Sequence, residues 1–243
     1  MKITVTENYA ELSRETARSV AEFINGNPGA LLCFAAGDTP LGTFAELIRM
    51  QEKGEVDLSA VFYAGLDEWV GLGPHDKGSC HQVMFGNFYA PAKIPRERIR
   101  VFDGLANPAD ECAAMGEWLD AKGGIGLTLL GVGMNGHIGF NEPANQPENS
   151  GRQAIVVPLD EVTQSVGRKY FDGAPCVPTG ITIALPTLFK ARRILVMACG
   201  EHKAPIIRQS FTSPPTPALP ASLLRNHPDL TLLLDKQAHP EAF

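Results

Sequence analysis

The sequence predicts an α/β fold: one domain with a doubly wound, mostly parallel sheet of the Rossmann-like kind and helices on both of its faces. Three observations support this prediction. Short continuous apolar runs are typical of buried parallel strands, they alternate with segments of helical periodicity, and polar residues follow directly after several of them. A chain of 243 residues with 44% hydrophobic content can fill one large core. Because no linker-like stretch or charge block divides the sequence, we expect residues 1–243 to form a single domain.

The expected helices and strands follow one another along the chain in alternating order. The expected helices are 8–25, a segment from Pro40, a segment from Pro108 to Ala121 and a segment after Lys203; the expected strands are 30–36, 61–66, 126–131, 179–185, 193–199 and 231–234. Thr39 is the expected cap of the second helix, because proline suits the first turn that follows such a cap. The stretches 72–100 and 144–178 lack a regular pattern. Three interpretations of the second stay open: a lid over the carboxyl ends of the strands, a disordered segment or a plain surface excursion.

The composition limits the classes of function. The net charge of −6 and the pI near 5.5 argue against a nucleic-acid surface, although local donors can still bind an anionic sugar phosphate. The first residues lack a signal-peptide pattern, and no apolar run reaches the length of a membrane span. The five cysteines are scattered and form no Cys-x-x-Cys pair. This favours reduced thiols in a cytoplasmic protein, without a structural zinc site.

The loop 131–143 is the most informative segment. An apolar run, 127–130, leads directly into glycine, asparagine, histidine and glutamate, so a buried strand delivers polar side chains to its carboxyl end, where open α/β sheets bind ligands. His137 and Glu142 are a potential proton-transfer pair, since five residues of loop allow a carboxylate–imidazole contact. The four glycines let the backbone approach a substrate closely. The alternative is a histidine with a structural role only.

Asp67 is the second candidate for chemistry. It follows the strand expected at 61–66, beside Trp69, which can lower the local polarity, and it is therefore placed to act as a base. Alternatively, it is a turn residue that accepts backbone hydrogen bonds. We expect a structural role for the neighbouring Glu68.

A candidate anion site lies nearer the start of the chain. Gly37, Asp38 and Thr39 stand between the strand expected at 30–36 and the amino end of the next helix. A strand, a glycine turn and a helix N-terminus in this order are typical of an anion site.

Three segments resemble motifs of the glucosamine-6-phosphate deaminase (isomerase) family. Gly136–Pro143 is similar to the signature loop of the family, Leu66–Gly71 to its Asp-Glu loop and Gly37–Thr43 to its phosphate loop. The resemblance runs from about residue 10 to about residue 235. It implies that Asp67 abstracts the C2 proton of the open-chain sugar, and that His137, supported by Glu142, opens the pyranose ring.

The resemblance also implies a phosphate clamp. Lys203 matches a family lysine that binds phosphate, and a basic residue near position 168 would complete the clamp. We expect this residue to be Arg168, with Lys169 as the alternative.

Two residues depart from the family pattern. Asn135 stands where many members have Asp, and because asparagine cannot ionise, it can support His137 only through hydrogen bonds. Asp38 stands where the loop usually has Gly or Ser. At about 4 Å its repulsion of a phosphate would be several kcal/mol at an intermediate dielectric. We therefore expect Asp38 to point away from the anion and to cap the helix, unless the anion sits differently.

The resemblance implies an enzyme of the isomerase and hydrolase type that converts glucosamine 6-phosphate to fructose 6-phosphate and ammonium. This scheme needs no cofactor and no metal, and the sequence contains no P-loop or Gly-x-Gly-x-x-Gly run. The open alternatives are a galactosamine-6-phosphate deaminase, a 6-phosphogluconolactonase and a non-catalytic sugar-phosphate sensor. The loop after Pro143 lacks the pattern of members activated by N-acetylglucosamine 6-phosphate, so we expect no such allosteric site, and a monomer or homodimer. The expected partner is the small-molecule substrate, without a nucleic-acid or membrane partner.

Overall fold

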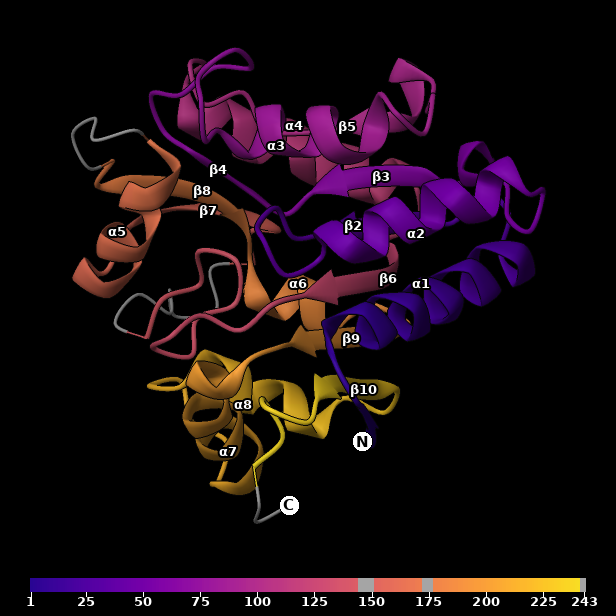
Figure 1. The fold of residues 1–243 in the computed structure, drawn as a ribbon. Helices are drawn as coiled ribbons and strands as arrows, with labels where there is room; N and C mark the ends of the chain where they lie inside the picture. Colours follow the sequence, from indigo (N-terminus) through magenta and orange to yellow (C-terminus); the bar gives the residue numbers. More distant parts are fainter. Residues whose placement is uncertain (144–150, 172–176, 241–243) are drawn as a thin grey trace.

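The computed structural model describes residues 1–143, 151–171 and 177–240, and Figure 1 shows how they fold. The strands are β1 (Lys2–Thr6), β2 (Leu31–Phe34), β3 (Phe62–Gly65), β4 (Asp67–Trp69), β5 (Ile99–Arg100), β6 (Ile125–Leu130), β7 (Ala154–Pro158), β8 (Thr179–Ile183), β9 (Arg193–Ala198) and β10 (Leu230–Asp235). The helices are α1 (Tyr9–Gly26), α2 (Leu41–Glu52), α3 (Cys80–Met84), α4 (Pro108–Ala121), α5 (Glu161–Gly167), α6 (Leu185–Phe189), α7 (Ala204–Thr212) and α8 (Pro220–Leu223). Short helical turns are η1 (Leu58–Ala60), η2 (Phe85–Tyr89), η3 (Arg96–Arg98), η4 (Arg168–Tyr170), η5 (Glu201–Lys203) and η6 (Leu224–Asn226).

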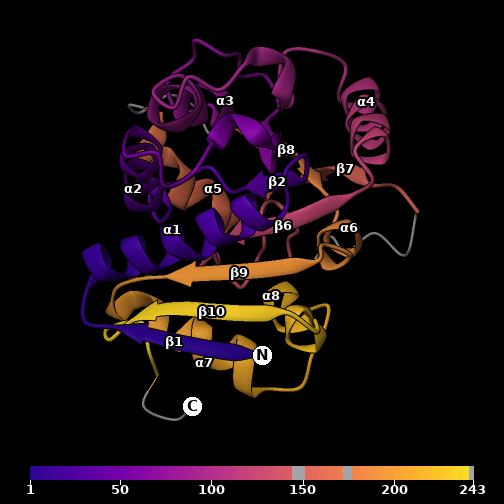
Figure 2. The same ribbon diagram turned by 90° about the vertical axis from the view of Figure 1, so that its right-hand side faces the viewer.

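The main sheet is doubly wound, as predicted. Within the described ranges its seven strands lie in the order β1-β10-β9-β6-β2-β3-β5, and every pair is parallel. From β2 the chain adds β3 and β5 on one side, and then returns to add β6, β9 and β10 on the other; Figure 2 shows β9, β10 and β1 side by side. The order reverses between β2 and β6, and ligands of open α/β sheets bind at the carboxyl ends of strands at such a switch point.

Two apolar layers hold the helices against the faces of this sheet. Leu32 and Phe34 of β2 belong to the layer under α1, α2 and η2, whereas Leu31 and Cys33 belong to the layer under α4, α6, α7 and α8. Alternating side chains of a strand point to opposite faces, so an apolar run without polar breaks, such as β2, can be buried on both sides.

A small antiparallel sheet, β4-β8-β7, was not predicted. The expected strand 179–185 forms as β8, but it pairs with β4 and β7 and not with the parallel sheet. Asp67 and Glu68 therefore belong to a strand of their own, which directly follows the end of β3. A third apolar cluster lies here, in which Trp69 packs edge-on against Phe140 at 4.7 Å between ring centroids.

Other expectations differ from the structure in detail. The helix expected from Pro40 begins at Leu41, with Pro40 in the cap position and no side-chain cap bond, so the prediction of Thr39 or Asp38 as a cap is wrong. Strand β7 and helix α5 lie in a stretch that showed no regular pattern. Of the lid considered for 144–178, residues 144–150 and 172–176 lie outside the described residues. None of the described helices has the length and apolar character to cross a membrane.

Candidate active site

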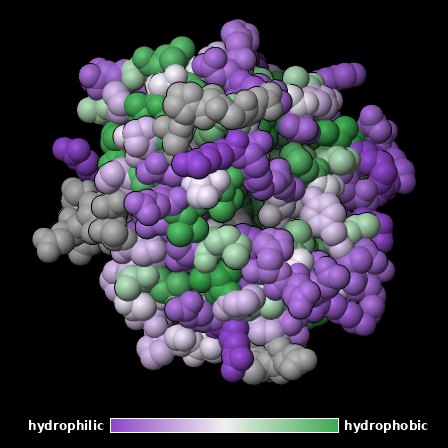
Figure 3. All heavy atoms as spheres, turned by 60° about the vertical axis from the view of Figure 1, so that its left-hand side comes forward, coloured by the Kyte–Doolittle hydropathy of each residue, from purple (hydrophilic) through white to green (hydrophobic). Residues whose placement is uncertain are grey.

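A cavity of about 1060 Å³ opens at the carboxyl ends of the parallel strands. Its walls come from the loops after β2, β6 and β9, from β4, and from the α5–η4 segment. Of the predicted site residues, it is lined by Gly37, Asp38, Thr39, Asp67, His137, Lys169 and Lys203. Figure 3, turned to bring the α5 side of the molecule forward, shows a face on which hydrophobic and hydrophilic side chains are mixed.

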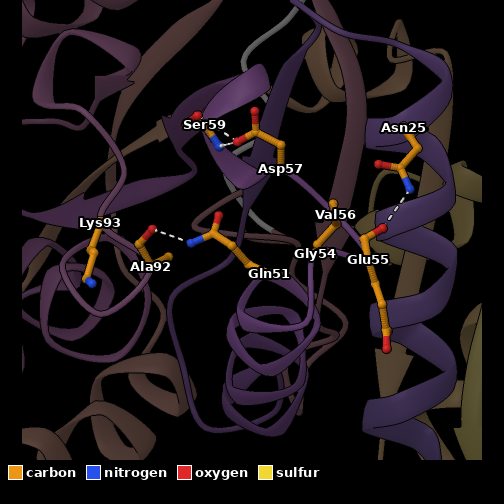
Figure 4. A pocket seen from close by; sticks show the side chains of 9 residues that line it. All are labelled: Asn25, Gln51, Gly54, Glu55, Val56, Asp57, Ser59, Ala92 and Lys93. Carbon is orange, nitrogen blue, oxygen red and sulfur yellow. Dashed lines mark hydrogen bonds between the residues drawn. The ribbon is translucent and has the colours of Figure 1, made fainter.

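A second pocket of about 650 Å³ holds none of these residues. It lies before the start of β3, at the opposite edge of the sheet, and includes Gln51 and Asn25. Figure 4 shows that their amides point to backbone oxygens, Gln51 to that of Ala92 and Asn25 to that of Glu55. Because these amides already make structural hydrogen bonds, the first cavity is the better candidate for an active site.

Asp67 is a nearly buried carboxylate on the wall of the cavity. Only 9% of the residue is exposed, and burial raises its pKa to about 7, although the Cys80 thiol and the charge of His137 act in the opposite direction. The Sγ atom of Cys80 lies 3.4 Å from its Oδ1 atom. A carboxyl group with a pKa near neutrality can take up and release a proton at physiological pH.

Glu68, the next residue, is enclosed by backbone donors and does not line the cavity. Its carboxylate accepts hydrogen bonds from the amides of Trp69, Cys80 and His81 at 2.8, 2.9 and 2.7 Å. Burial raises its pKa to about 7 despite these three donors. This geometry is that of a structural group that ties β4 to the start of α3.

His137 lies in the loop after β6. Its ring packs so closely on the backbone of Gly133 that a Cβ atom there would lie 2.3 Å from the ring, so the loop needs glycine at this position. The Nδ1 atom lies 2.9 Å from Oγ1 of Thr163 and 3.5 Å from Oε2 of Glu142. These contacts fix the ring orientation and engage Nδ1.

Glu142 and Asn135 support the imidazole from outside the cavity lining. Burial alone would raise the pKa of Glu142, but contacts with His137, Thr163 and Asn135 hold it below its ordinary value. The Nδ2 atom of Asn135 donates to Oε2 of Glu142 at 2.9 Å, and its Oδ1 atom accepts from the His137 amide at 3.2 Å. Asn135 therefore acts as a neutral bridge between the carboxylate and the backbone of the histidine.

The phosphate candidates form a second group in the same cavity. Gly37 has a φ of 155°, a conformation that favours glycine, and it leads to the uncapped amino end of α2 beside Thr39. Lys203 donates to the carbonyl of Val132 at 2.7 Å, and burial together with the charge of Lys169 lowers the pKa of Lys203. The ammonium groups of Lys169 and Lys203, together with the amides at the start of α2, offer the positive charge and the hydrogen-bond donors that a phosphate dianion needs.

Lys169 lines the cavity, whereas Arg168 does not. Both belong to η4, and successive residues of a 3₁₀ turn point about 120° apart, so only one of them can face inward. The Lys169 ammonium pairs with the Asp38 carboxylate at 2.5 Å, and the Tyr170 hydroxyl lies 3.4 Å from the same oxygen. Asp38 therefore caps no helix; it pairs with a cation of the cavity.

The sequence alone did not single out Thr163 or Cys80. Thr163 belongs to α5, and nothing in its neighbourhood carries a motif. Cys80 is 13 residues from Asp67, and only the fold brings the two together.

Fold and cavity together define an α/β protein with a cavity at the switch point of its sheet, lined by Lys169, Lys203 and the amino end of α2. The family model described as "Glucosamine-6-phosphate isomerases/6-phosphogluconolactonase" matches residues 4–232, and the chain belongs to this family.

Similar proteins cover nearly the whole chain. It is 39% identical over 240 residues to a glucosamine-6-phosphate deaminase of Thermoanaerobacter pseudethanolicus, and the aligned region covers 98% of this chain and 94% of that protein. It is 40% identical over 241 residues to one of Clostridium perfringens, with 98% of both covered. A solved structure of a monomeric glucosamine-6-phosphate deaminase matches with a TM-score of 0.90 at 33% identity, over 98% of both chains. A 6-phosphogluconolactonase from Thermotoga maritima matches with a TM-score of 0.79 at 17% identity, over 97% of this chain and 99% of that one, which shows the shared fold alone.

Proposed function

We propose that this protein is a glucosamine-6-phosphate deaminase, which isomerises the aldose to a ketose and releases fructose 6-phosphate and ammonium. One observation carries the proposal: Asp67 and His137, from segments that follow different strands, line one cavity together with Lys169 and Lys203. The identity of 33–40% with deaminases over nearly the full chain supports this choice of substrate.

The ring-opening step is assigned to His137. Because its Nδ1 atom is engaged by Thr163 and Glu142, Nε2 is the atom that exchanges a proton with the ring oxygen of the sugar. The pKa of Glu142 lies below its ordinary value, so this residue is a carboxylate at neutral pH and stabilises the charged imidazole. Asn135 holds that carboxylate in place.

The isomerisation step is assigned to Asp67. Its carboxylate takes the proton from C2 of the open-chain sugar while O1 gains a proton, which gives an enolamine. It then returns the proton to C1 while the amino group loses one, which gives a C2 imine. Water then hydrolyses the imine and ammonium leaves. A base whose pKa lies at about 7 combines a populated carboxylate with a useful proton affinity near neutral pH.

The phosphate is assigned to Lys169 and Lys203, with the amides that follow Gly37 and the Thr39 side chain as further donors. In the structure Lys169 pairs with Asp38. We propose that the phosphate displaces this carboxylate, whose side chain is 62% exposed and can turn outward into water. This exchange removes the repulsion that a fixed carboxylate would impose on the dianion.

We propose that the protein is a monomer, in line with the 33% identical solved structure, which is described as monomeric. Light scattering during size-exclusion chromatography tests this, and a mass of 26.1 kDa is expected. A cytoplasmic location is proposed from the scattered cysteines, which form no Cys-x-x-Cys pair. Closure of 144–178 over the cavity stays one of three open interpretations. Within its described part, α5 and η4 line the cavity, and protection from proteolysis by the substrate would support closure.

The test is a panel of glucosamine 6-phosphate, galactosamine 6-phosphate and 6-phosphogluconolactone with the wild-type protein. We expect ammonium and fructose 6-phosphate in equal amounts from the first, with the highest kcat/KM. A higher kcat/KM for the galacto epimer would move the assignment to that substrate. Lactone hydrolysis without ammonium release, or binding without turnover, would contradict the proposal.

A further inference from the structure

We propose that Cys80 is a positioning residue for the base: its thiol donates a hydrogen bond to Oδ1 of Asp67 and leaves Oδ2 to take the C2 proton. The Sγ–Oδ1 distance is 3.4 Å, and both side chains line the cavity. The role of Asp67 in this inference rests on the proposed function, whereas the thiol–carboxylate contact does not.

The backbone holds this thiol from two sides. Glu68, which is 1% exposed, accepts from the amides of both Cys80 and His81. The preceding Ser79 is fully buried, and its Oγ atom accepts from the amide of Gln82 at 3.0 Å. The first turn of α3 is thereby fixed to β4, which carries both carboxylates. The buried Glu68 carboxylate accepts from three amides, two of them in the first turn of α3. These bonds fix the start of this short helix, and the Cys80 side chain is thereby held against Asp67.

The direction of the hydrogen bond follows from the environment of the thiol. Burial, and then the charges of Asp67 and Glu68, raise the pKa of Cys80 well above its ordinary value. The group is therefore a protonated thiol at neutral pH, and it donates to the carboxylate. A donor to the charged form of a carboxyl group lowers its pKa, so the thiol opposes the effect of burial on Asp67.

The other groups that act on Asp67 come from its own strand and from two neighbouring segments. His137, from the loop after β6, lowers its pKa. Glu68 of β4 and Cys33 of β2 are also within electrostatic range of Asp67. Substitution of Cys80 leaves these groups in place, so a change in the titration of Asp67 reports the loss of the thiol.

The kinetic test compares Cys80→Ala and Cys80→Ser with wild type, with Cys112→Ala of α4 as the matched control. The pH profile of kcat/KM is the readout, because a merely structural loss would scale the profile without moving it. In Cys80→Ala the acidic limb should move to higher pH, and activity at pH 6 should fall about three- to tenfold, the equivalent of one modest hydrogen bond. In Cys80→Ser, whose hydroxyl is the stronger donor, the limb should return to the wild-type position or below it. Cys112→Ala should follow wild type. An acidic limb in Cys80→Ala that coincides with that of wild type overturns the proposal.

A second readout needs no turnover. The rate at which iodoacetamide alkylates Cys80, followed by mass spectrometry at pH 8, should be at least several-fold higher in Asp67→Asn than in wild type, because the charge that keeps the thiol protonated is gone. Cys199, which also lines the cavity, serves as the internal reference. Equal Cys80 rates in the two proteins overturn the thiol–carboxylate contact. A wild-type protein that releases no ammonium defeats the proposed function instead, and the two failures are thus distinguishable.

Discussion

Substitution of the base should make the protein inactive and, at alkaline pH, more stable. Asp67 titrates in the fold at about 7 against an ordinary value of 3.8. Each pKa unit is equivalent to about 1.4 kcal/mol, so ionisation of this buried group opposes folding by about 4 kcal/mol above pH 7. Because the pKa of Asp67 is higher in the folded state, the native protein binds one more proton than the unfolded chain at pH values between 3.8 and about 7. The contribution of Asp67 to stability therefore falls as the pH rises from about 4 to about 7 and is constant above that.

Asp67→Asn removes the charge and keeps the shape and the acceptor for the Cys80 thiol. The difference in free energy of unfolding between the variant and wild type, measured by urea denaturation, should therefore favour the variant more at pH 8 than at pH 5, by about 2 to 3 kcal/mol. Asp110→Asn, an exposed position in α4, controls for the loss of one negative charge. A difference that does not change with pH, or that favours wild type at pH 8, would refute the burial of a titrating base.

Four further outcomes follow from the same site. Lys169→Ala should raise the KM for glucosamine 6-phosphate about tenfold or more, the equivalent of one charge-assisted hydrogen bond, whereas the neighbouring Arg168→Ala should behave as wild type; equal effects in ammonium-release kinetics would contradict the assignment of Lys169. Asp38→Ser should lower that KM several-fold and leave kcat unchanged, because the phosphate no longer displaces a carboxylate from Lys169; a raised KM would show that Asp38 helps binding. Glu142→Gln should lower kcat about a hundredfold, since an amide cannot stabilise the charged imidazole, and stopped assays at saturating substrate would reveal an unchanged kcat if this is wrong. The kcat/KM of wild type should rise with pH through about 7 as Asp67 ionises; a profile that is flat between pH 6 and pH 8 would exclude this group as the base.

The parallel sheet could be predicted because its strands are apolar on both faces. The run 30–36 is unbroken by polar residues, 126–131 contains only Thr128, and both lead into glycine turns, so they indicated both the strands and the edge at which the site lies. The small antiparallel sheet could not be predicted in the same way. Strand β4 has three residues, and β7 ends in Pro158 within a proline-rich stretch; neither shows a period of its own.

The meeting of Asp67 and His137 at one cavity was predictable, because both residues lie in motifs at the carboxyl ends of strands. Contacts between distant segments were not. The ion pair of Asp38 and Lys169 joins residues 131 positions apart, and the choice between Arg168 and Lys169 depends on the rotation of a single helical turn. Cys80 and Thr163 lie in segments whose sequence has no regular pattern, and only tertiary packing brings them to the carboxylate and the imidazole.

The role of Asp67 is tested most directly by separating binding from proton transfer in one variant. Asp67→Asn should still be protected from thermal melting by glucosamine 6-phosphate to the same extent as wild type, since the lysines that bind the phosphate are unchanged, while its ammonium release falls by at least a hundredfold. Ammonium release at the wild-type rate by the variant would contradict the account, because the C2 proton would then leave to a group other than this carboxylate.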